Sequence, residues 1–246
     1  MARYALIACE VMRREFDFLA PRSENTIDIF YMDLGLHAAG PEKMAQKLQD
    51  TIDRIEQQKY DAILLGYGLC SNGICSLRAD IPVVIPRAHD CITLFMGSKQ
   101  DYRAYFDTHK GTYYVTAGSM GTSLTGELLE GAFSIDALRA EYLEKYDEEE
   151  AEYLLDMLGN PLKQYRRITF VNNGVGEVDA RRGDARKIAL DKGWEFDEFQ
   201  GNTGILRRLV DGMWDGSEFL VVRPGETAVP AYTEEEIIRA AGAATA

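Results

Sequence analysis

Short apolar runs alternate with segments of helical periodicity along most of the chain, and this alternation constrains the fold more than any other feature. The strand-like runs of the first part are "RYALIAC", "TIDIFYMD", "YDAILLGYG" and "IPVVIPR". Those of the second part are "TYYVTAG", "RITFVNN", "WEFDEFQ" and "EFLVVRPG". Strands separated by helices pair in parallel, because each connection must cross the sheet, and the helices then cover both faces. The pattern therefore predicts an α/β fold with mostly parallel sheets.

The two parts of the sequence have similar plans, with strands and intervening helices in each. We therefore expect two pseudo-repeated βα halves that face a central cleft: an N-terminal half over residues 1–110 and a C-terminal half over 111–246. Acidic residues crowd the region 124–165, which predicts a solvated helical insertion in the second half. The polar tail after Pro224 predicts a short last helix.

Composition narrows the classes of function. With 246 residues, 46% of them hydrophobic, the chain can bury a large core without disulfides. Lys and Arg number 27 against 40 Asp and Glu, and the net charge of −13 argues against nucleic acid as a partner. The N-terminal sequence predicts neither a signal peptide nor a membrane span, so we expect a cytoplasmic protein. Four cysteines in a reducing cytoplasm are then thiols or metal ligands.

Three of the cysteines follow predicted strands. Cys9 ends "RYALIAC", Cys70 comes just after "DAILLGYG", and Cys91 comes shortly after "PVVIPR". Because the carboxyl ends of neighbouring parallel strands open at one edge of a sheet, these thiols can converge there. His89 is the candidate fourth ligand. The set predicts a zinc site or an iron–sulfur cluster with three cysteine ligands and either His89 or an open position.

Two other interpretations of the cysteines stay open. Free cysteines are often buried core residues, and the sequence has no Cys-x-x-Cys pair. Alternatively, Cys70 or Cys91 is a metal-free nucleophile with His89 as its base. Cys75 is a weaker ligand candidate than His89, because the chain is expected to become helical at Ser71.

Several residues around the cysteines are candidates for catalysis or ligand binding. His89 and Glu10 are the candidate catalytic residues, although an acid directly after Cys9 also suits the first turn of a helix. Glycines at 66, 68 and 73 bracket Cys70 and would let backbone approach a cofactor. Three polar residues of later loops could bind the same cofactor or an anion: Ser119, Asn173 and Thr203.

The stretches "LIACEVMRRE", "ILLGYGLCSNG" and "IPRAHDCITLFMGS" resemble a domain-of-unknown-function family, family 1638, and the resemblance covers about residues 3–225. The resemblance implies an anaerobic bacterial or archaeal setting near corrinoid-dependent methyltransferases. It also implies that Cys9, Cys70, His89 and Cys91 correspond to the motif residues of the family. The Asp-x-His-x-x-Gly type of cobalamin signature is absent from the sequence, so corrinoid enters through context alone.

Together, these features predict a metal-centred protein of anaerobic one-carbon metabolism. The centre would be an iron–sulfur cluster or a zinc ion that activates a thiol for methyl transfer. The alternative is a metal-free accessory protein that holds a small ligand or a corrinoid for a methyltransferase. Expected partners are a small-molecule substrate, a corrinoid protein or methyltransferase, and a second copy of the chain in a homodimer.

Overall fold

The computed structural model describes residues 1–34, 36, 40–70, 72–121, 139, 142–144, 146–158, 164–231, 233 and 236–242. The chain divides into two compact units. The first comprises Met1–Ala104, Asn173–Gly176 and Gln200–Ala246, and the second comprises Tyr105–Asn172 and Glu177–Phe199. The division into halves at residue 110 stays a prediction, and so does the cleft between those halves.

The first unit is built on a five-stranded sheet. Its strands, in spatial order, are β2 (Thr26–Met32), β1 (Arg3–Cys9), β3 (Ala62–Gly66), β4 (Val83–Pro86) and β8 (Phe219–Val222). The first four are parallel, and β8 runs antiparallel to β4. The prediction of an α/β fold with mostly parallel sheets is confirmed.

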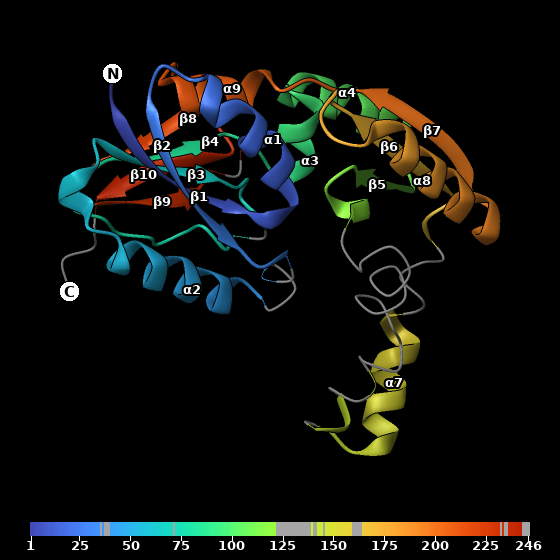
Figure 1. Ribbon diagram of the computed structural model, residues 1–246. Coiled ribbons are helices and arrows are strands. Elements are labelled where there is room, and N and C mark those ends of the chain that lie inside the picture. The colour runs from blue at the N-terminus through green and yellow to red at the C-terminus, as the bar shows by residue number, and fades with distance from the viewer. Residues whose placement is uncertain are drawn as a thin grey trace. The chain divides into compact units, whose positions relative to one another are not determined.

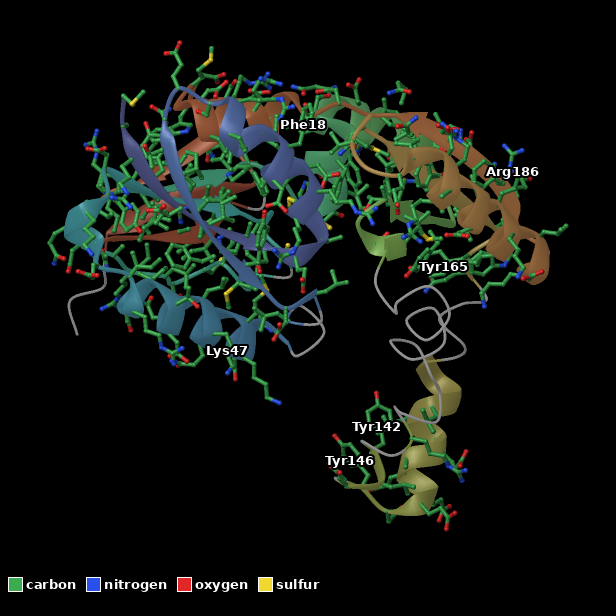
Figure 2. All side chains as sticks on the ribbon, in the orientation of Figure 1. Phe18, Lys47, Tyr142, Tyr146, Tyr165 and Arg186 are labelled. Atoms are coloured by element: carbon green, nitrogen blue, oxygen red, sulfur yellow. The ribbon has the colours of Figure 1, made fainter. Side chains whose placement is uncertain are left out.

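Helices cover both faces of this sheet. They are α1 (Arg13–Leu19), α2 (Pro41–Arg54), α3 (Cys91–Met96) and α9 (Gly204–Asp211), with short 3-10 turns η1 (Glu10–Met12), η2 (Ala20–Arg22) and η4 (Gln57–Lys59). In Figure 1, α2 lies on the opposite side of the sheet from α1 and α9. Helix α2 buries Met44, Leu48 and Ile52, whereas the exposed side chain of Lys47 points away from the sheet (Figure 2).

The strand order of the first unit changes direction at β1. The chain runs from β1 outward to β2 and then returns to β3 on the other side of β1. In doubly wound sheets, ligands bind outside the carboxyl ends of the strands at such a switch point, because the two following loops diverge there. The pairing of β1 and β3 ends at Ala8 and Gly66. The switch point is therefore flanked by Cys9 and Tyr67, the next residues along the two strands.

The C-terminal part of the chain differs from the sequence prediction. Instead of a short last helix, the tail forms an antiparallel hairpin of β9 (Glu226–Pro230) and β10 (Ile238–Gly242). The Arg87 guanidinium donates to the carbonyl oxygens of Gly216 and Glu236, at 2.9 and 2.8 Å, and also to that of Ile238. Backbone pairing and the contacts of Arg87 therefore hold the tail in a hairpin. Helix propensity, on which the predicted helix was based, does not determine its structure.

The predicted helix after Cys70 is also wrong for the described residues. Residues 72–76 form turns, and Ser71 lies outside the described residues. Asn72 and Ser76 adopt positive φ angles of 72° and 66°. Residues whose backbone is in the left-handed region cannot continue a right-handed helix, so the chain forms turns here.

The second unit contains a smaller sheet in the order β5 (Thr112–Thr116), β6 (Arg167–Asn172) and β7 (Glu195–Gln200), with β5 and β6 parallel. Its helical elements are the end of α4 (Lys99–Thr108), η5 (Ser119–Gly121), α7 (Glu148–Leu158) and α8 (Val178–Lys192). The core of the unit includes Val115, Ile168, Phe170, Ala185 and Ala189.

Part of the predicted acidic insertion, 124–165, lies in the described ranges. Helix α7 falls inside it and begins with three glutamates. Near this helix, the rings of Tyr142 and Tyr146 contact each other edge to face with centroids 6.1 Å apart (Figure 2). The rest of the predicted insertion lies outside the described residues. Within the described ranges, every helix is too short or too polar to cross a bilayer.

Substitution of Gly66 tests the packing at the switch point. A Cβ at Gly66 would lie 2.6 Å from the Ala8 Cβ and 2.7 Å from the ring of Phe16. We expect Gly66→Ala to lower the free energy of unfolding by about 1–3 kcal/mol, the usual cost of overpacking. Urea unfolding followed by circular dichroism measures the change.

Gly183→Ala is the matched control, because a Cβ at this position of α8 meets no atom within 4 Å. Its higher helix propensity should raise the free energy of unfolding by about 0.5–1 kcal/mol. Equal free energies of unfolding for Gly66→Ala and the wild type would contradict the close packing of β1, β3 and α1.

Candidate functional site

Three thiols follow the carboxyl ends of three adjacent parallel strands. Cys9 is the last residue of β1, Cys70 lies in the loop after β3, and Cys91 begins α3 after β4. The loops after β3 and β4 are held side by side, because the amides of Leu69 and Cys70 donate to the carbonyls of Ala88 and His89 at 2.8 and 3.0 Å. We call Cys9, Cys70 and Cys91 the thiol site.

The backbone around Cys70 is tightly constrained. A Cβ at Gly68 would lie 2.7 Å from the backbone nitrogen of Asp90, so only glycine lets the two loops approach this closely. Cys70 itself has a φ of 45°, in the left-handed region that residues with a Cβ rarely adopt. Such strain in a non-glycine residue persists only where the surroundings enforce it, and it is often associated with functional sites.

Burial dominates the electrostatics of the thiol site. It raises the pKa of the Cys9 thiol, raises that of Cys70 to about 12, and places that of Cys91 well above its ordinary value. After burial, the next causes for Cys91 are Cys70, Asp90 and Cys9. The three thiols are therefore close enough to influence one another. Without a bound cation, they are protonated at neutral pH.

Nearby backbone amides partly oppose the effect of burial on the thiols. The Val11 amide lowers the pKa of Cys9, the amides of Gly68 and Cys91 lower that of Cys70, and the Cys91 amide lowers the pKa of its own thiol. Amide donors of this kind favour the thiolate form and are common around metal-bound sulfur.

Tyr67 follows β3 directly, and the register of β1 and β3 places it beside Cys9. Its side chain is only 3% exposed. Burial raises the pKa of its hydroxyl, and Cys9, Cys70, Cys91 and Asp33 raise that pKa further. Among the described residues, the hydroxyl has no hydrogen-bond partner. Sequence reasoning missed Tyr67, although its place between two glycines directly after a strand was a usable signal.

The residues flanking Cys91 have separate roles. Asp90 is the N-cap of α3: it accepts hydrogen bonds from the Thr93 amide at 3.0 Å and from the Tyr102 hydroxyl at 3.1 Å. His89 is exposed. In the described part of the chain, no hydrogen bond or ion pair joins its imidazole to the thiol site. The roles of His89 as a metal ligand and as a base stay predictions.

The other candidate residues have local structural roles. Glu10 pairs with Arg13 at 3.1 Å on the surface. Gly73 packs against Met44, since a Cβ there would lie 2.3 Å from its sulfur. Ser119 belongs to the second unit and closes a turn with Thr116, whose amide donates to its Oγ at 2.8 Å. Thr203 precedes α9 without a side-chain cap bond. Their predicted binding roles are untested by these contacts.

Metal-ligand geometry is not preformed in the described residues: no three His, Cys, Asp or Glu side chains there form a group that could hold an ion as placed. Cys75 is a half-buried free thiol whose pKa is raised by burial alone, without a contribution from the other cysteines. Cys75 is therefore electrostatically separate from the thiol site.

A buried carboxyl group lies in α1, just beyond Cys9. Glu15 is fully buried, and its Oε1 accepts a hydrogen bond from Asn173 Nδ2 at 3.0 Å, while Oε2 has no partner among the described residues. Asn173 is itself oriented by the Val175 amide, which donates to its Oδ1 at 3.2 Å. Burial raises the pKa of Glu15. The sequence contained a signal for the burial of Glu15, because this residue lies on the same helical face as the apolar residues Met12, Phe16 and Leu19.

Replacement of Glu15 by Gln should make stability less dependent on pH. Below the ordinary glutamate pKa of about 4.3, the side chain is neutral whether the chain is folded or unfolded. At higher pH the unfolded chain ionises while the folded chain retains the proton, so wild-type stability falls as the pH rises toward the raised folded pKa. Glu15→Gln does not lose stability in this way, because glutamine does not ionise.

Urea unfolding at pH 4, 6 and 8 checks this expectation. Glu15→Gln should match the wild type at pH 4 and be more stable than the wild type at pH 6 and at pH 8. Glu24→Gln, at an exposed position of the same unit, controls for the change in net charge. A constant difference between Glu15→Gln and the wild type across the three pH values would contradict a buried neutral acid.

Comparison with known proteins identifies a family and no function. The sequence profile of the family described as "Protein of unknown function (DUF1638)" matches residues 31–210. No curated protein and no solved structure matches the chain. The matched range includes Cys70, His89 and Cys91, and it covers well over half of the sequence. The chain belongs to the DUF1638 family.

Proposed function

We propose that the protein is a metal-dependent enzyme whose centre is held by the thiolates of Cys9, Cys70 and Cys91. One observation carries the proposal: three thiols follow the carboxyl ends of three adjacent parallel strands at the switch point of a doubly wound sheet. The backbone amides that lower the thiol pKa values support it, because they favour negative charge on sulfur.

The chain's own residues would prepare the site for the metal. Cys9 is buried and Cys70 and Cys91 are half-buried, and the constrained loop around Gly68 fixes the backbone from which Cys70 projects. As placed, the thiols form no ion-binding group, so binding requires the cysteine side chains to approach one another. Three protein thiolates leave a position for His89 or for a substrate.

The chemistry of the centre depends on which metal is bound. A zinc ion would hold a substrate thiol as thiolate for methyl transfer, whereas a cluster with three cysteine ligands would leave one iron open for substrate or for electron transfer. In the transfer, the new sulfur–carbon bond forms as the bond between the methyl group and its donor breaks, and the donor keeps the bonding electron pair. The thiol proton is released on binding to zinc.

The cellular setting is part of the same proposal. The resemblance of the cysteine and histidine motifs to family 1638 supports anaerobic, corrinoid-linked one-carbon metabolism in the cytoplasm. A corrinoid protein or methyltransferase is then the proposed macromolecular partner, and a homodimer the proposed assembly. The net charge of −13 supports a partner other than nucleic acid.

A second candidate is a metal-free accessory protein that binds a small ligand or a corrinoid. The raised thiol pKa values favour it, because neutral buried thiols would line a ligand site as small apolar groups. This candidate predicts thermal stabilisation of the metal-free chain by its ligand. The same pKa values disfavour metal-free thiol catalysis, which requires an accessible thiolate.

Metal analysis of anaerobically purified protein tests the proposal. We expect stoichiometric zinc, or iron with acid-labile sulfide and a visible absorption band. Cys70→Ala should reduce the bound metal by about tenfold or more, since a ligand is lost. Inductively coupled plasma mass spectrometry and sulfide determination give the content per chain.

Cys75→Ala is the matched control, because it removes a thiol from the same loop region but outside the thiol site. It should retain the wild-type metal content. Circular dichroism confirms that both variants are folded. Full occupancy in Cys70→Ala, or a wild-type protein without metal, would rule out a cysteine-held centre.

A further inference from the structure

We infer that the Tyr67 hydroxyl donates a hydrogen bond to an acceptor atom of the group bound at the thiol site. Tyr67 follows β3 directly, and the register of β1 and β3 places it beside Cys9 at the switch point. Its side chain is 97% removed from solvent, as its 3% exposure shows. The inference rests on the proposed function, because it assigns a donor to the same centre.

The lack of a partner for this hydroxyl needs an explanation. Buried hydroxyl groups in folded proteins are nearly always hydrogen-bonded, because an unpaired buried donor loses its interactions with water without replacement. Among the described residues, which include the three thiols, no atom accepts a hydrogen bond from the Tyr67 hydroxyl. Phenylalanine would fill the same space without this loss, and a group bound at the thiol site is the partner that we infer for the hydroxyl.

The chemistry of the site defines the class of acceptor. The hydroxyl is a donor, since a tyrosine side chain is an ordinary phenol and carries its proton at neutral pH. An electron-rich sulfur beside the three cysteines meets this requirement. If the centre is an iron–sulfur cluster, the acceptor is a cluster sulfide. If it is zinc, the acceptor is a metal-bound thiolate. In both cases Tyr67 stabilises negative charge on sulfur, which hydrogen bonds tune in such centres.

Tyr67→Phe tests the inference with two measurements. In chelator-treated, metal-free protein, the variant should melt about 2–6 °C higher than the wild type, because an unpaired buried hydroxyl is removed. In the loaded protein the hydroxyl is paired, so its loss should weaken the centre. If zinc is bound, its affinity should fall by about tenfold in competition with a chromophoric chelator. If a cluster is bound, its reduction potential should become more negative.

Tyr31→Phe is the matched control in the same sheet. The Tyr31 hydroxyl donates to Asp17 Oδ1 at 2.7 Å, so its removal breaks an existing hydrogen bond. This variant should melt lower than the wild type in the metal-free state and leave the metal affinity or reduction potential unchanged. The melting temperatures of the two metal-free variants should therefore change in opposite directions. This difference separates the loss of an unpaired hydroxyl from a general effect of Tyr→Phe substitution.

The possible failures are distinguishable. If wild-type protein binds metal but Tyr67→Phe has the same metal affinity or potential, the inference is wrong and the proposed function stands. A lower melting temperature of metal-free Tyr67→Phe, as in the control, would also overturn it, because the hydroxyl would then have a partner within the chain. If wild-type protein binds no metal, the proposed function fails and the inference fails with it.

Discussion

The reversal of strand order at β1 is the constraint on which the candidate site depends. Because β2 and β3 lie on opposite sides of β1, the carboxyl ends of β1 and β3 form a switch point, where doubly wound sheets bind their ligands. The contact of Gly68 with the backbone of Asp90 then brings the loop after β4 to the same place. Three cysteines that are far apart in sequence become neighbours through this topology and through one glycine.

Burial has opposite consequences for the thiol site in its two states. In the metal-free chain it raises the thiol pKa values and keeps the sulfurs neutral. A bound cation would reverse this preference, because a metal ion deprotonates the thiols that coordinate it and the low polarity of the surroundings strengthens the attraction. Neutral thiols and an unpaired Tyr67 hydroxyl are together the features expected of a site that is complete only with its ligand.

The sequence predicted the elements of the site better than its details. Alternating apolar runs identified β1, β3 and β4, each of which is followed by one of the three cysteines. Because these strands pair in parallel, the loops that carry Cys9, Cys70 and Cys91 lie at the same edge of the sheet. Periodicity missed the β9–β10 hairpin, since its residues are held by pairing and by Arg87, far away in sequence. It also missed the turns after Cys70, because the positive φ angles there belong to residues other than glycine.

The two residues that sequence reasoning overlooked have a common physical character. Tyr67 and Glu15 are polar side chains in positions that the fold buries, and each keeps an atom without a hydrogen-bond partner among the described residues. An aromatic residue after a strand, or an acid on an apolar helical stripe, is usually explained by packing or by solvation. Only the burial of the individual atoms shows that neither explanation applies here. For Tyr67, which the register places beside Cys9, the bound group that we infer would supply the missing acceptor.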